Sequence, residues 1–447
     1  MRLAGLPGGV SPGPRLYNLF PLLAGPMAGW ADHFARIAAM DFDWVYLNPI
    51  SYPGFSGSLY AVKDERRLHP LLKGDDPRPD GQIIAAMVAE AHERGLKVML
   101  DLVINHASRD SLLAEAHPEW FVRDARGGLV SPHAADPNDP DNPDKRTVWG
   151  DLAEFDLSPG PARQALVGHF ADLVGWLVGL GVDGFRCDAA YKVPAEVWAG
   201  VIGAARRANP ETRFFAETLG CATEEVAALA PAGFDMLFNS ACWWDFRADW
   251  FLDIYAEQRT IAPSVAFPES HDTERFAATL ADLDPEAAAA RAVWQYLYAA
   301  SVSSGVMLPV GYELGFARRL DVVGSRPGQW EVPRFDISAA IGAINRAKAS
   351  HLALSAEVPM RRLDSPTGVV GLLRQSEFDP DWALIVINPS GNGPWSLDYD
   401  DPDDPLARRA AQGGEPLTAM PEGPWKPTAE APLLDLADGE VRLFVGP

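Results

Sequence analysis

Cysteine is scarce in this chain: 447 residues contain only Cys187, Cys221 and Cys242. An odd and sparse set offers no disulfide framework and favours a reducing compartment. The sequence has no C-x-x-C pair and no histidine-rich ligand spacing, which argues against a structural zinc site.

Long apolar runs are also missing. No uninterrupted stretch approaches the ~20 apolar residues of a membrane span. The residues after Arg2 are broken by prolines and glycines, unlike the apolar region of a signal peptide. We therefore expect a soluble, cytoplasmic protein.

Positive charge is in short supply as well. The chain has 38 Lys and Arg against 61 Asp and Glu, a formal net charge of −23. Nucleic acids and anionic membranes bind cationic patches, so neither is an expected partner. A neutral polar ligand such as a sugar is compatible with this charge, and so is a simple role of the acids in solubility.

What the chain does have, over its first two-thirds, is an alternation of short apolar runs with amphipathic segments. This alternation is typical of repeated β–α units. The runs that we expect to be strands lie near residues 15–20, 42–47, 98–104, 181–188, 213–217, 234–238, 264–268 and 306–310. Eight such strands predict the α/β class and a (β/α)₈ barrel, the TIM-barrel fold.

Two segments depart from this alternation. Residues 106–157 form a long excursion rich in Pro, Asp, Asn and Gly, which favours an inserted lid domain after the third strand. From residue 356 the pattern changes to alternating strands. We therefore expect the barrel at 1–105 and 158–355, the inserted domain at 106–157, and a C-terminal all-β domain, a β-sandwich, at 356–447.

Four of the expected strands end in acids, at Asp101, Asp188, Glu217 and Asp272. The C-terminal strand ends of such a barrel meet at one face, where paired carboxylates can cleave a glycosidic bond. Side chains alternate along a strand, so Arg186 and Asp188 share a face. The guanidinium would keep that carboxylate ionised, as a nucleophile requires, although a structural ion pair is an equally good interpretation of the two residues alone.

The motifs at these strand ends resemble those of the α-amylase family, glycoside hydrolase family 13. Residues 101–106, DLVINH, resemble its D-x-V-x-N-H motif, and residues 184–188, GFRCD, resemble G-F-R-x-D. Glu217 is similar to the acid of the fifth strand, and residues 269–272, ESHD, resemble x-x-H-D of the seventh. All four occur in the order that the family has.

The resemblance implies a role for each residue. Asp188 would be the nucleophile that forms a covalent glycosyl-enzyme, and Glu217 the general acid and then base. Asp272 would hold hydroxyls of the reacting sugar and distort its ring. His106 and His271 would donate hydrogen bonds to the same ring.

Physical reasoning agrees with this division of roles. Arg186, which we place in the binding set, is expected to lower the pKa of Asp188. The apolar residues before Glu217 are expected to raise its pKa enough for it to carry a proton. We expect Asp101, which would orient Arg186, and Asn105 to act as structural support.

Aromatic residues are candidates for sugar binding. Tyr60, in a loop that resembles the one after the family's second strand, would stack beneath the reacting sugar, or is an ordinary loop aromatic. Trp243 and Trp244 begin a dense aromatic cluster after the sixth strand. They could be platforms for a glucan chain, although such clusters more often pack a helix against a barrel.

A metal site is left open. The family resemblance implies that Asn105 could bind calcium together with acids of the inserted domain. Residues 136–142, DPNDPDN, offer hard oxygen ligands, but they suit an extended loop equally well and lack EF-hand spacing. We therefore expect no cofactor, with Ca²⁺ as an alternative.

A second resemblance concerns one branch of the family. Residues 117–121, HPEWF, and 311–314, GYEL, are similar to the α-1,4-glucan maltosyltransferases. With about fourteen residues before the first strand, we expect no room for the extra N-terminal domain of those enzymes, which argues against phosphate-dependent transfer.

These resemblances imply a retaining glycoside hydrolase or transglycosylase that acts on α-glucans or malto-oligosaccharides. The alternatives are a maltosyltransferase, which could depend on phosphate, and a catalytically silent glucan-binding protein.

Overall fold

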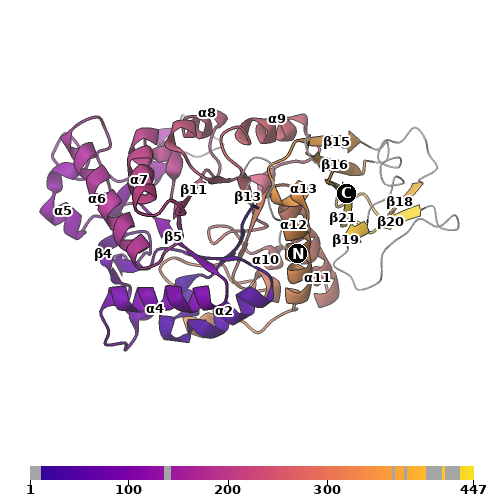
Figure 1. Ribbon diagram of the computed structural model, residues 1–447, viewed down its shortest axis with the longest axis horizontal. Coiled ribbons are helices and arrows are strands. Elements are labelled where there is room, and N and C mark those ends of the chain that lie inside the picture. The colour runs from indigo at the N-terminus through magenta and orange to yellow at the C-terminus, as the bar shows by residue number, and fades with distance from the viewer. Residues whose placement is uncertain are drawn as a thin grey trace.

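Eight parallel strands close into a barrel, and this confirms the predicted fold (Figure 1). The computed structural model describes residues 12–134, 142–364, 368–376, 380–398, 415–417 and 433–446. Around the barrel the strands are β1 (Arg15–Asn18), β2 (Trp44–Leu47), β5 (Lys97–Leu102), β10 (Gly184–Cys187), β11 (Arg213–Glu217), β12 (Met236–Phe238), β13 (Ser264–Ala266) and β14 (Gly305–Pro309). The barrel closes because β14 pairs with β1, with Val306 opposite Arg15.

Helices connect the strands and cover the outside of the barrel (Figure 1). The longer ones are α2 (Trp30–Ala39), α4 (Asp80–Glu93), α6 (Pro161–Gly179), α7 (Ala195–Ala208), α9 (Asp249–Gln258), α11 (Pro285–Ser301) and α12 (Ser338–Ser350). Proline at the first position of α6 and α11 suits a helix start, since its missing N–H would have no partner there. No helix in the described part of the chain is both long and apolar enough to cross a membrane.

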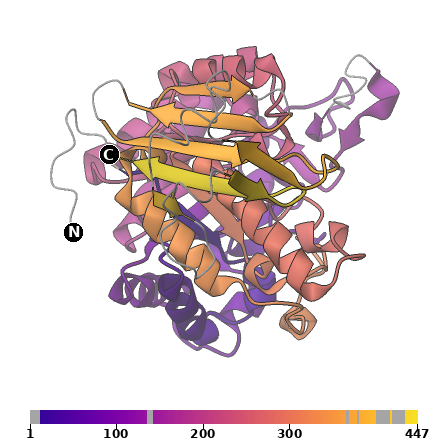
Figure 2. The same ribbon diagram turned by 90° about the vertical axis from the view of Figure 1, so that its right-hand side faces the viewer.

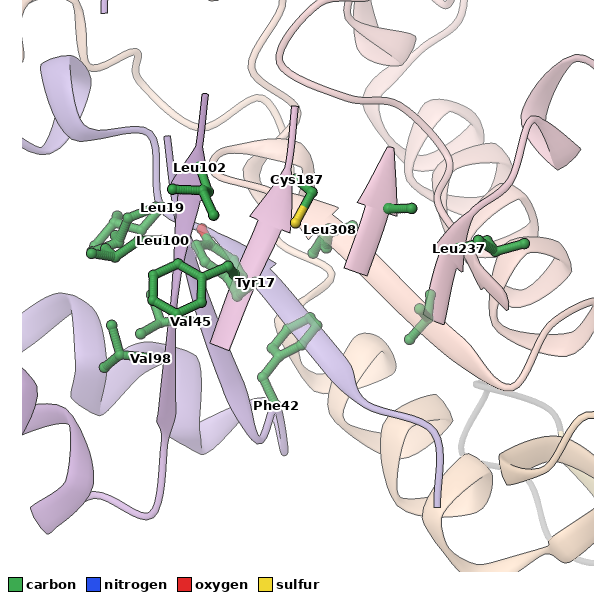
Figure 3. Close-up of a cluster of buried hydrophobic side chains, with 14 of the residues drawn as sticks. Tyr17, Leu19, Phe42, Val45, Val98, Leu100, Leu102, Cys187, Leu237 and Leu308 are labelled. Carbon is green, nitrogen blue, oxygen red and sulfur yellow. The ribbon is translucent and has the colours of Figure 1, made fainter. Parts of the chain in front are cut away.

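The alternation of side chains along each strand produces two separate apolar clusters. Val45, Val98 and Cys187 belong to the larger cluster, between the strands and the helices (Figure 3). Their neighbours in sequence point into the barrel, where Trp44 and Met99 belong to a second buried cluster. Inward-facing residues at the C-terminal strand ends therefore lie on top of a packed apolar layer, which gives the site a rigid floor.

The inserted segment after β5 is built from short elements. A strand β6 (His106–Ser108) pairs antiparallel with β9 (Leu152–Glu154), and β7 (His133–Ala134) pairs with β8 (Thr147–Val148). The histidine and tryptophan of the HPEWF motif stack on each other: the rings of His117 and Trp120 are 4.0 Å apart and nearly parallel. Trp120 also contacts His169 of α6 edge-on. This motif therefore packs the inserted segment against the barrel.

The C-terminal part is all β, as predicted, and it lies at one side of the barrel (Figure 2). Its five-stranded antiparallel sheet has the order β15 (Met360–Asp364), β16 (Val370–Gln375), β17 (Trp382–Ile387), β21 (Val441–Gly446) and β19 (Glu415–Leu417). A separate pair is formed by β18 (Trp395–Asp398) and β20 (Leu433–Leu436).

Buried polar groups anchor the barrel to the chain that leads into this sheet. The amine of Lys348, at the end of α12, donates to the carbonyls of Ala300, Ser303 and Leu354 at 2.6–2.7 Å. Arg374, on β16, donates to the carbonyls of two residues just before β15. The sheet is thus attached by directional bonds as well as by apolar packing.

Candidate active site

The acids that the sequence places at strand ends converge on one guanidinium. Arg186 of β10 is 4% exposed, and its side chain points into the barrel. Its Nη1 donates to Asp101 at 2.9 Å and to Asp188 at 2.7 Å. Its Nη2 lies 3.7 Å from Glu217. One buried cation therefore neutralises part of the charge of three carboxylates.

Asp101 is the most deeply buried of these acids. Besides Arg186, it accepts hydrogen bonds from the hydroxyls of Tyr46 and Tyr60, both at 2.7 Å. Its side chain is fully occupied by these donors, so it fixes the guanidinium and the two phenols relative to each other. This placement suits the support role expected for Asp101.

Glu217, the last residue of β11, is held by backbone donors. The N–H of Ala189 donates to Oε2 at 2.7 Å and the N–H of Leu219 to Oε1 at 3.1 Å. Ala189 adopts a left-handed conformation with φ of 41°, which is rare for a residue other than glycine. The strained backbone at Ala189 therefore directs its N–H towards the carboxyl group of Glu217.

The pKa values of the two neighbouring acids are both raised. Burial is the main cause that raises the pKa of Glu217 to about 6; the charge of Asp188 adds to it and Arg186 opposes it. Burial also raises the pKa of Asp188, and Arg186 only partly offsets this effect. Arg186 does lower the pKa of Asp188, as expected, but burial has the larger effect, so the net shift is upward.

The loop after β13 brings in the third acid. His271 Nε2 lies 3.0 Å from Asp272 Oδ2 and 2.8 Å from the hydroxyl of Tyr60. Desolvation at the cavity wall favours the neutral form of Asp272, but His271 and the cations nearby lower its pKa to about 2. The ring of Tyr60 stacks on that of His271, with 9° between the planes. The carboxylate of Asp272, 61% exposed, is the most accessible of the acids.

These residues surround a cavity of about 450 Å³. Its lining contains the three predicted catalytic acids, Asp188, Glu217 and Asp272. It also contains Tyr60, Asn105 and His106. His106 Nε2 lies 3.2 Å from the carbonyl of Tyr60, and its Nδ1 has no protein partner within the described residues. Acids, imidazoles and a phenol around one hollow are the groups that bind and cleave a sugar.

Several residues of the lining are absent from the sequence-based candidates. They include Trp149, Asp151, Tyr191, Lys192, Val322 and Val323. Tyr191 and Lys192 follow Asp188 within four residues, so their nearness was readable from the chain. Trp149 and the two valines come from the inserted segment and from the loop after β14, and nothing local in the sequence points them to the cavity.

Trp243 and Trp244 are not among the residues that line this cavity in the described part of the chain. Trp244 packs edge-on against Phe251 of α9, with ring centres 5.7 Å apart. This position fits the packing alternative and not a sugar platform. Trp243 is 55% exposed and contacts Phe267 edge-on, outside the cavity.

The described residues do not by themselves fit a calcium ion. The Oδ1 of Asn105 is buried with no protein partner, as a ligand oxygen would be. However, the ammonium group of Lys192 is part of the same cavity wall, and it donates to the carbonyl of His133. No group of three or more His, Cys, Asp or Glu side chains that could hold a metal occurs in the described ranges. The acids of the stretch 136–142 lie outside those ranges, so a calcium site stays a prediction.

Comparisons with known proteins agree with the fold. Residues 16–124 match the profile of the glycogen debranching enzyme, glucanotransferase domain. The solved α-amylase from Lactobacillus plantarum superposes with a TM-score of 0.71 at 21% identity, over 97% of this chain and 99% of that chain.

Curated relatives are similar over most of this chain. It is 30% identical over 398 residues to the α-1,4-glucan:maltose-1-phosphate maltosyltransferase of Burkholderia pseudomallei. The matched region covers 84% of this chain and 33% of that protein. It is 27% identical over 384 residues to the α-amylase MalA of Haloarcula japonica, over 81% of this chain and 52% of that protein. The chain thus spans about a third to a half of these relatives. Together these matches confirm the resemblance found in the sequence motifs.

Proposed function

This chain belongs to the α-amylase family, and from that premise we propose that it is a retaining enzyme that breaks α-glucosidic bonds of α-glucans. The observation that carries the proposal is the convergence of Asp188, Glu217 and Asp272 on one cavity above one guanidinium. In a double displacement, a carboxylate attacks the anomeric carbon while an acid protonates the departing oxygen. An acceptor hydroxyl, deprotonated by the same residue, then releases the sugar from the enzyme.

The geometry favours Asp188 as the nucleophile. The guanidinium of Arg186 lies 2.7 Å from Asp188 but 3.7 Å from Glu217, so it stabilises a negative charge on Asp188 more strongly. Both acids resist ionisation in this buried setting, and the pair titrates together. Below about pH 6, Glu217 holds the proton that a general acid needs.

Asp272 and the residues around it would bind the reacting ring. With its pKa lowered to about 2, Asp272 stays ionised throughout the neutral range and accepts hydrogen bonds from sugar hydroxyls. His106 also lines the cavity and is a further residue that could contact the sugar. Hydrogen bonds that tighten as the ring flattens would lower the barrier.

The charge of the cavity favours a neutral donor over a sugar phosphate. Its lining contains four carboxyl groups, of which that of Glu217 is protonated below about pH 6, against the ammonium group of Lys192 and the guanidinium of Arg186 beneath them. A phosphate placed in this setting would meet net repulsion. The alternative, a maltosyltransferase, is favoured by the name of the Burkholderia relative, and it would require a phosphate site that the lining of this cavity does not supply. A silent glucan-binding protein is disfavoured because all three acids are present.

The test is NMR of the purified protein with maltohexaose, with and without inorganic phosphate. Hydrolysis would give new reducing ends, α-anomers first. Transglycosylation would redistribute chain lengths without phosphate, and a phosphate-dependent sugar phosphate would select the alternative. Asp188→Asn and Glu217→Gln are expected to lower turnover by several orders of magnitude. Substantial turnover in either variant would contradict the assignment.

A further inference from the structure

Two buried and oppositely charged side chains brace the loop that carries Asp272. Arg275 Nε lies 2.9 Å from Glu269 Oε1, and the two side chains are 1% and 3% exposed. The N–H of Phe276 donates to the same carboxylate. The two ends of the segment 269–276 are thus joined, and Asp272 lies in the middle of the closed loop.

Hydrogen bonds inside the loop hold the backbone of Asp272. Its N–H donates to the hydroxyl of Ser270 at 3.2 Å, and the N–H of Ser270 donates to the hydroxyl of Thr273 at 3.0 Å. On the other side, Arg319 donates to the carbonyl of Asp272 at 2.8 Å. Only the carboxylate is left to face the cavity.

The brace is anchored in the barrel wall. Arg275 Nη2 donates to the carbonyl of Val310, directly after β14, at 2.8 Å. The N–H of Val310 in turn donates to the carbonyl of Asn18 in β1 at 2.9 Å. The position of the loop is therefore set by the two strands at the barrel closure.

Stability alone is a poor explanation for this ion pair. Taking two charges out of water is unfavourable, and an apolar pair of similar volume is often as stable or more stable. A fixed arrangement of charges is better suited to holding one carboxylate in place. We propose that Glu269 and Arg275 are positioning residues, which set where the carboxylate of Asp272 meets the reacting sugar ring. This inference rests on the proposed function above.

The experiment compares Arg275→Lys with a second arginine-to-lysine change outside the loop, Arg36→Lys. Lysine keeps the charge, but one ammonium group cannot replace the guanidinium fork that joins Glu269 and Val310. Arg36 also forms an ion pair with a fully buried carboxylate, Glu313, but is not part of the loop. The readouts are melting temperature, kcat/KM on maltohexaose, and the Kd of acarbose, whose flattened ring resembles the oxocarbenium-like transition state.

We expect kcat/KM and acarbose affinity to fall about 10- to 100-fold in Arg275→Lys, since a shift of about 1 Å can cost about 10²-fold in rate. Arg36→Lys should change both less than about 2-fold at a similar loss of melting temperature. Glu269→Gln, which should act like Arg275→Lys, is the second variant if the first does not fold.

Each outcome decides between the proposals. Equal effects of Arg275→Lys and Arg36→Lys would overturn the inference, and so would a failure of both loop variants to fold while the control folds. A wild-type protein that turns over no α-glucan would overturn the proposed function, and acarbose binding alone would then decide the inference. A wild-type protein that neither turns over an α-glucan nor binds acarbose would overturn both proposals.

Discussion

The raised pKa of Glu217 makes a prediction about stability that does not depend on turnover. Folding raises the pKa from 4.5 to about 6, a difference of about 1.5. Each pKa unit corresponds to about 1.4 kcal/mol, so ionising Glu217 in the folded protein costs about 2 kcal/mol. The side chain is 12% exposed, so solvent screens little of this cost.

The direction in which this contribution to stability changes with pH follows from proton binding. The folded state holds the proton of Glu217 more tightly than the unfolded state does. Its contribution to stability is therefore present below pH 4.5 and is lost as the pH rises through about 6. Glu217→Gln cannot ionise and its amide oxygen can still accept an N–H, so the variant resembles the protonated wild type. Relative to the wild type, it should gain about 2 kcal/mol between pH 4 and pH 8.

The assay is thermal unfolding of the wild type and Glu217→Gln between pH 4 and pH 8. With an unfolding entropy of about 2.1 cal/mol/K per residue, the gain corresponds to about 2 °C. Glu93→Gln, at an exposed position of α4, controls for loss of one negative charge from an acidic protein. A difference between Glu217→Gln and the wild type that stays constant with pH, or that falls, would refute the reasoning.

Three further predictions concern activity and the barrel base. The pH profile of kcat/KM should fall above about pH 6 as Glu217 loses its proton, and a profile flat to pH 8 would contradict its role as acid. Trp149, 41% exposed in the cavity wall, offers an apolar face to a sugar; Trp149→Ala should raise KM for maltohexaose about 10-fold with kcat largely kept, whereas Trp243→Ala should change neither. Lys348→Met leaves three buried carbonyls without donors and should destabilise the protein by more than about 3 kcal/mol, measured by denaturant unfolding; a loss below about 1 kcal/mol would contradict this.

Local patterns in the sequence predicted the barrel and the convergence of the acids well. Asp101 and Glu217 each follow a short continuous apolar run, as buried parallel strands have, and Arg186 follows Phe185, so the ends of these strands were readable. Once these ends meet in a barrel, the acids must lie close together.

Properties that depend on distant parts of the chain could not be read in this way. The pKa of Asp188 is set by how completely the surrounding loops exclude water, which a neighbouring Arg does not reveal. Trp149 lies in the cavity wall although nothing in the sequence marks it, whereas Trp244, a predicted platform, packs against Phe251 of α9. Val323 reaches the cavity from more than a hundred residues after Glu217.

The pairing of β1 with β14 has a consequence for folding during synthesis on the ribosome. The two strands run from Arg15 to Pro309, a span of 295 residues. At about 5–20 residues per second, about 15–60 s pass between the synthesis of the first strand and the last. During that time β1 has an open edge and unburied apolar side chains. We therefore expect the nascent chain to be vulnerable to aggregation until residue 309 has left the exit tunnel, however stable the finished barrel is.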